Sequence, residues 1–101
     1  MTQSLKHRRF RFTYRTETYL IEVLSDDRLR WTREAGDDIG KTDEESYVAS
    51  FPRDGQELLT WVEADGLGLS NLLDWDAGTV TTHAKVGRDV FENPGKLTPA
   101  S

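Results

Sequence analysis

The chain has 101 residues, of which 36% are hydrophobic and 31% are charged, and its formal net charge is −5. This length suits one small domain with a single core. Cysteine is absent, which excludes disulfides, thiolate catalysis and cysteine metal sites, and only His7 and His83 could supply imidazole. No apolar run reaches the ~18 residues of a membrane span, and the N-terminus lacks an apolar signal-peptide core. We therefore expect a soluble, cytoplasmic domain with no metal, no cofactor and no membrane partner.

Residues that favour turns, namely Gly, Asn, Asp and Pro, recur about every ten positions, as in Asp65-Gly66 and Asn93-Pro94-Gly95. Between them, apolar and polar residues alternate with the period of a half-buried β-strand, whereas helical periodicity is weak. The alternation predicts seven strands, over residues 9–15, 19–24, 28–32, 47–51, 58–63, 67–75 and 79–86. A short eighth strand is expected at Asp89–Glu92. The predicted fold class is all-β.

An open antiparallel sheet of seven to eight strands would have two exposed edges, and closing the sheet into a barrel removes both. A small closed meander barrel is therefore the architecture we expect. Residues 1–94 are predicted to form this single domain. Residues 95–101 are predicted to form a short flexible C-terminal tail.

A basic segment, Lys6 to Arg15, is interleaved with aromatic residues, a pattern typical of proteins that bind single-stranded nucleic acid. The negative net charge argues against that function, and the strand spacing of the aromatic residues would turn them toward the core. We expect no nucleic-acid partner. Instead, the arginines are predicted to pair with the acidic residues of Asp37–Glu45, or to join two subunits of a homodimer.

The segment Trp61-Val62-Glu63-Ala64-Asp65-Gly66 is the strongest candidate for chemistry. Alternation places Trp61 and Glu63 on one face of the predicted strand. If this face points outward, Glu63 is an ordinary solvated carboxylate. If it points inward, Glu63 lies in an aromatic cavity, where desolvation would raise its pKa and suit it to proton transfer. A tryptophan is costly to leave in water, which favours the inward orientation.

His83 lies, by alternation, on the polar face of the predicted strand 79–86, as a surface histidine would. If that face instead points inward, His83 would join Glu63 as an acid/base partner.

Three elements in order resemble the MoaF-like domains, named for molybdenum cofactor biosynthesis protein F: Trp61-x-Glu63-x-x-Gly66, the strand Leu69–Asp74, and Gly78-Thr79-Val80. The resemblance extends over roughly Arg9 to Val86, and the chain is also similar, more distantly, to the bacterial phenolic acid decarboxylases. Both families are small lipocalin-like (calycin-type) barrels with an internal ligand cavity. The resemblance implies the same fold and cavity here.

In the decarboxylases, a glutamate of this motif transfers protons, while tyrosines of the first strands and an arginine hold a para-hydroxycinnamate. By position Glu63 matches the glutamate, and Tyr14 and Tyr19 match two of the tyrosines. Arg33 is the nearest candidate for the arginine. Because Phe12 replaces another tyrosine, the resemblance implies ligand binding more strongly than decarboxylation.

The predicted function is thus binding of a small aromatic or conjugated compound in an aromatic-lined cavity. The predicted catalytic residue is Glu63, and the predicted ligand-binding residues are Tyr14, Tyr19, Trp31, Trp61, Arg33 and His83. One alternative is a lyase, isomerase or cyclase that uses Glu63 for proton transfer. A second is a protein-interaction module whose barrel is filled by its own side chains.

Overall fold

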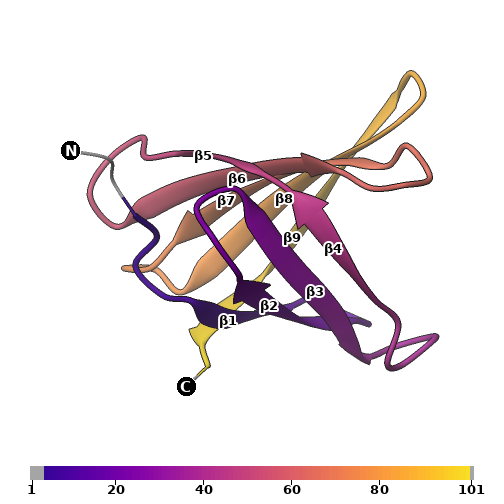
Figure 1. Cartoon of the computed structure of the whole chain (residues 1–101), viewed down its shortest axis with the longest axis horizontal. Helices are drawn as coiled ribbons and strands as arrows, with labels where there is room; N and C mark the ends of the chain where they lie inside the picture. Colours follow the sequence, from indigo (N-terminus) through magenta and orange to yellow (C-terminus); the bar gives the residue numbers. More distant parts are fainter. Residues whose placement is uncertain (1–3, 101) are drawn as a thin grey trace.

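The computed structural model describes residues 4–100, which form nine β-strands and no helix (Figure 1). The strands are β1 (Arg9–Thr13), β2 (Thr18–Val23), β3 (Arg28–Ala35), β4 (Thr42–Ser46), β5 (Val48–Ser50), β6 (Gln56–Val62), β7 (Gly68–Asp74), β8 (Thr79–Val86) and β9 (Asp89–Pro99). They form one antiparallel sheet in the order β4-β3-β2-β1-β9-β8-β7-β6-β5. The predicted all-β meander is confirmed.

The sheet is nearly closed into a barrel because its outermost strands, β4 and β5, are separated in the chain by Tyr47 alone. β4 pairs with β3 and β5 pairs with β6, so one extended segment links both ends of the sheet. The Tyr47 backbone N–H donates to the Asp27 carbonyl at 3.0 Å, and its hydroxyl donates to the Ser25 carbonyl at 2.9 Å. These bonds hold the bend in place. With β4 and β5 taken as one bent strand, the barrel is the predicted lipocalin-like meander.

Side chains fill one end of this barrel, which we call the closed end. Phe10, Leu29, Leu59, Leu73 and Val80 are fully buried there, and each such side chain contributes about 1.5–3 kcal/mol through burial.

The N-terminal segment adds to the closed end. The Lys6 backbone N–H donates to Glu57 Oε2 at 2.7 Å, and the Trp75 indole N–H donates to Glu57 Oε1 at 2.8 Å. The His7 ring packs on Trp75 with a centroid distance of 4.3 Å. The buried Glu57 carboxylate therefore ties this segment to the barrel.

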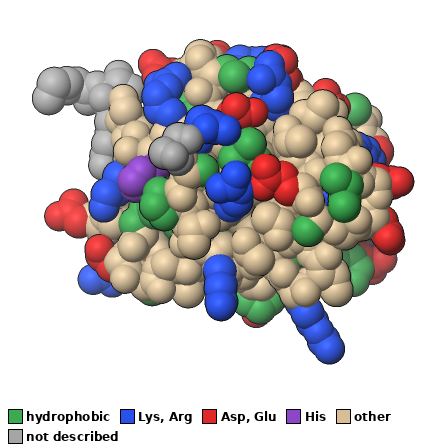
Figure 2. All heavy atoms as spheres, turned by 90° about the horizontal axis from the view of Figure 1, so that it is seen from below, with side chains coloured by type: hydrophobic (Ala, Val, Ile, Leu, Met, Phe, Trp, Pro, Cys, Tyr) green, Lys and Arg blue, Asp and Glu red, His purple; other side chains and the backbone are tan. Residues whose placement is uncertain are grey.

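Arginines and glutamates alternate on the outer face of β1–β4, and on the face shown in Figure 2 basic and acidic side chains are interspersed. The expected pairing of the N-terminal arginines with residues 37–45 is wrong for Arg9 and Arg11. The strand register places Arg9 opposite Glu22, and Arg11 reaches Glu34 at 2.7 Å. Such exposed pairs contribute only about 0–1 kcal/mol each.

The C-terminal part of the barrel differs from the prediction, because β9 continues through residues 95–99. Leu97 is 3% exposed, and its N–H donates to the Gly78 carbonyl at 2.9 Å. The glycine of Asn93-Pro94-Gly95, which resembled a turn signal, lies inside the strand. A Cβ at Gly95 would lie 2.9 Å from both Tyr14 Cδ1 and the Thr13 carbonyl oxygen, so close packing accounts for this glycine. The predicted domain boundary at residue 94 is corrected accordingly.

Candidate ligand-binding cavity

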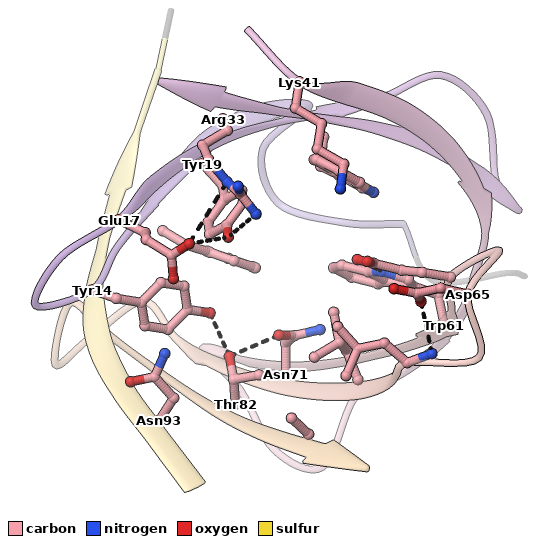
Figure 3. Close-up of a pocket in the computed structure, with 16 residues that line it drawn as sticks. Tyr14, Glu17, Tyr19, Arg33, Lys41, Trp61, Asp65, Asn71, Thr82 and Asn93 are labelled. Atoms are coloured by element: carbon pink, nitrogen blue, oxygen red, sulfur yellow. Dashed lines mark hydrogen bonds and ion pairs between the residues drawn. The ribbon is translucent and has the colours of Figure 1, made fainter. Parts of the chain in front are cut away.

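The other end of the barrel, the open end, contains a cavity of about 300 Å³ (Figure 3). Buried rings of Phe12, Trp31 and Trp61 line its depth. Charged side chains surround them toward solvent: Glu17, Arg33, Lys41, Glu63 and Asp65. An apolar interior with a few polar groups is the usual composition of a small-molecule site, and this volume is at the small end of the range for such sites.

Aromatic rings pack edge to face along one wall of the cavity. Tyr14 and Tyr19 have a centroid distance of 6.1 Å, and Tyr19 and Trp31 have one of 6.0 Å, with interplanar angles of 72° and 80°. This arrangement is the one that ring quadrupoles favour. The Trp31 indole N–H donates to the buried Glu45 carboxylate at 3.0 Å. Trp31 therefore offers the cavity its ring surface and no hydrogen-bond donor.

Tyr19 is held at the rim by Glu17 and Arg33 (Figure 3). Its hydroxyl donates to Glu17 Oε2 at 3.0 Å and accepts from Arg33 Nη2 at 3.1 Å. The guanidinium carbon of Arg33 also lies 5.3 Å from the Tyr19 ring centroid, within the range of a cation–π contact. Burial raises the pKa of Tyr19. Among residues 4–100, the buried Nε of Arg33 has no hydrogen-bond partner.

Tyr14, next to Tyr19, begins a second polar chain, which runs to Thr82 and Asn71 (Figure 3). Its hydroxyl lies 2.5 Å from Thr82 Oγ1, Thr82 donates to Asn71 Oδ1 at 2.8 Å, and Asn71 Nδ2 donates to the Leu59 carbonyl at 3.2 Å. Burial raises the pKa of Tyr14 to about 12, so the phenol is protonated at neutral pH. Asn71 and Thr82 are themselves buried and directly paired between β7 and β8.

Glu63 lies at the end of β6, where the turn 63–67 begins. The Glu63 N–H donates to the Leu67 carbonyl, and the Gly66 N–H donates to the Glu63 carbonyl, both at 2.8 Å. The Trp61 indole N–H donates to Glu63 Oε2 at 3.3 Å. Burial is the main cause that raises the pKa of Glu63, and the negative charge of Glu45 adds to it, while the bond from Trp61 opposes both. A half-buried carboxylate of this kind can accept a hydrogen bond or move a proton.

Six of the predicted site residues line this one cavity: Tyr14, Tyr19, Trp31, Arg33, Trp61 and Glu63. His83 is not brought to it. The neighbouring Thr82 points inward, so His83 points outward, where its Nε2 lies 3.5 Å from Glu92 Oε2 and its side chain is 66% exposed. The structure thus corrects the inclusion of His83 among the ligand-binding residues.

Glu17, Asn71 and Thr82 belong to the cavity but were not predicted to do so. Asn71 had a usable signal, because it shares a strand face with Leu69 and Leu73, and a polar residue on an apolar face is unusual. No sequence pattern indicated Glu17, since it lies in the turn between β1 and β2.

Within residues 4–100, no group of three or more His, Asp or Glu side chains is arranged to hold a metal ion. The same part of the chain contains no helix long and apolar enough to cross a membrane.

The fold and the cavity define an antiparallel β-barrel with one filled end and one hollow, aromatic-lined end. The model of the MoaF-like family matches residues 6–98, and the chain belongs to this family, as the sequence resemblance predicted. No curated protein matches the sequence. Among solved structures, the chain is similar to "a putative beta-lactamase from Burkholderia vietnamiensis", with a TM-score of 0.87 and 23% identity over 98% of this chain and 100% of that one. At this identity, the similarity shows the fold alone.

Proposed function

We propose that this protein binds a small organic ligand with an aromatic or conjugated ring system in the open-end cavity. The observation that carries the proposal is a space of about 300 Å³ whose walls are aromatic rings and whose few polar groups converge on it. Rings in a ligand can continue the edge-to-face packing of Tyr14, Tyr19 and Trp31. The volume favours a compact ligand of about two fused rings.

The alternative of a filled barrel that works only through its surface is less well supported. Side chains fill the closed end, but the open end is hollow. A module that needs only its outer surface has no use for a cavity lined by buried polar groups such as Asn71 and Thr82.

Two neighbouring substitutions in β8 test the proposal. Ala84 lines the cavity, whereas Lys85 is exposed. Ala84→Phe is expected to fill the space and abolish calorimetric binding of 2-naphthol, while Lys85→Phe should bind as the wild type does. Equal binding by both variants would reject the open-end cavity as the site.

A second candidate is an enzyme, namely a lyase, isomerase or cyclase in which Glu63 moves a proton. The raised pKa of Glu63 beside a cavity favours it. Incubation with para-hydroxycinnamates, followed by mass spectrometry, should then yield a product in the wild type but none with Glu63→Gln. Absence of any product from the wild type would reject the decarboxylase form of this candidate. Among residues 4–100, no serine lines the cavity, and the sequence contains no Ser-x-x-Lys. The beta-lactamase description therefore gains no support here.

We also propose a cytoplasmic location, supported by the absence of cysteine, and a homodimer. Exposed apolar side chains of the β8–β9 hairpin, Val86, Val90 and Phe91, support the dimer. Light scattering should give twice the chain mass, and a mass of 11.5 kDa would reject the dimer. Cell fractionation checks the location.

A further inference from the structure

We infer that the cavity selects an uncharged ring compound whose hydroxyl or amino group donates a hydrogen bond to Tyr14, in preference to a carboxylate or an ether at that position. This inference rests on the proposed function, because it assumes a ligand in the open-end cavity. It concerns the direction of one hydrogen bond, which the neighbouring buried groups determine.

The direction follows from tracing the protons outward from the backbone. The Leu59 carbonyl can only accept, so Asn71 turns its Nδ2 toward it and its Oδ1 toward Thr82. Thr82 has a single hydroxyl proton and donates it to Asn71 Oδ1 at 2.8 Å. The oxygen of Thr82 can therefore only accept from Tyr14, and the Tyr14 proton is used in that bond.

The consequence for a ligand is that Tyr14 presents only lone pairs to the cavity. A ligand hydroxyl or amine can donate to them, whereas an ether or a carboxylate would place one acceptor against another. Buried polar groups that must meet an unlike partner are the usual basis of strong discrimination between similar ligands.

The hydroxyl proton of Tyr19 is likewise already used in a hydrogen bond within the protein. Tyr19 donates its proton to Glu17 and accepts from Arg33, so it also has no proton to offer a ligand. Glu63 adds a further acceptor, with its Oε2 bonded to Trp61. At the rim, Lys41 and the exposed Asn93 can donate. The two tyrosine hydroxyls and Glu63 therefore offer acceptors to the cavity. Its wall also holds donors at other positions, namely the buried Arg33 Nε, which has no hydrogen-bond partner within residues 4–100, and the N–H of Asn71 Nδ2 that Leu59 does not use.

Three probes of the same ring size test the inference by calorimetry: 2-naphthol, 2-methoxynaphthalene and 2-naphthoate. The wild type is expected to bind 2-naphthol more tightly than 2-methoxynaphthalene by about 2- to 12-fold, the ratio that one neutral hydrogen bond supports, and to bind 2-naphthoate most weakly. Tyr14→Phe should reduce the ratio to about one, since the acceptor is lost.

Thr82 supplies the more specific test, with a matched control. Thr82→Val keeps the side-chain shape but removes the hydroxyl, which frees the Tyr14 proton to point at the ligand. The preference should then fall to about one, because the freed hydroxyl can donate to the oxygen of either ligand. Thr82→Ser keeps the hydroxyl and should keep the wild-type preference. This pair also serves if Tyr14→Phe fails to fold, and thermal melting checks that each variant is folded.

The outcomes separate this inference from the proposed function. Binding of 2-naphthol and 2-methoxynaphthalene with equal affinity by the wild type, or the same preference in Thr82→Val and Thr82→Ser, would overturn the inference and leave the ligand-binding cavity standing. No binding of any of the three probes by the wild type would overturn both.

Discussion

Gly95→Ala is expected to destabilise the protein and disturb the cavity, although Gly95 lies within a strand. The new Cβ would lie 2.9 Å from Tyr14 Cδ1 and 2.9 Å from the Thr13 carbonyl oxygen, so the ring or the β1–β9 pairing must shift. An extra methyl group in a packed region costs about 1–3 kcal/mol. For a domain of this size, each 1 kcal/mol lowers Tm by about 4–8 °C.

Gly68→Ala is the matched control for this substitution. Gly68 is also in a strand, but the nearest atom to an added Cβ is Lys85 Cβ at 3.7 Å, an ordinary contact. Alanine there should be neutral or stabilising by up to about 1 kcal/mol. Thermal melting and 2-naphthol calorimetry compare both variants with the wild type. An unchanged Tm and unchanged affinity in Gly95→Ala would refute the close packing of Tyr14 on β9.

Three other changes have definite expected results. Glu57→Gln sets an amide NH₂ against one of two N–H donors and should lower the free energy of unfolding, measured by chemical denaturation, by about 1–3 kcal/mol. The exposed control Glu34→Gln should lower it by only about 0–1 kcal/mol. Similar losses in both variants would contradict the role of Glu57 at the closed end. Burial raises the pKa of Glu63 in the folded protein above its unfolded value of about 4.3. The protonated Glu63 therefore adds to the free energy of unfolding below about pH 4.3, and this contribution is lost as the pH rises through the folded pKa. Glu63→Gln should therefore melt at or above the wild type at pH 7 and level with it at pH 4, and a lower Tm at pH 7 would contradict this sign. Truncation after Pro94 removes the buried Leu97 and should abolish the β-sheet circular dichroism signal, which a flexible tail would leave intact.

The predictable part of the fold came from strands with one apolar face. Every second side chain is buried in β1, which carries Phe10 and Phe12, and around Trp31 in β3 and Trp61 in β6. The alternation of apolar and polar residues was therefore sufficient to predict these strands. The strand Thr42–Ser46 escaped prediction because Glu45 is its one buried side chain, and pairing with β3 holds it instead.

The candidate site was predictable where a residue's own type and strand face carried the signal, as for Trp61 and Glu63. The Asn71–Thr82 bond depends on the register between β7 and β8, which no local pattern specifies. The placement of His83 depended on the same register, since a shift by one residue exchanges the inward and outward faces. Glu17 reaches Tyr19 only through the conformation of the β1–β2 turn.

The most direct test of the account is a ¹H–¹⁵N NMR titration of the wild type with 2-naphthol, observing the three tryptophan indole N–H resonances. Trp31 and Trp61 line the cavity, whereas Trp75 lies at the closed end and bonds to Glu57. Single Trp→Phe variants assign the three signals. We expect the Trp31 and Trp61 resonances to shift with saturation and the Trp75 resonance to stay in place. Shifts confined to Trp75, or no saturable shift of any indole, would contradict a ligand site at the open end.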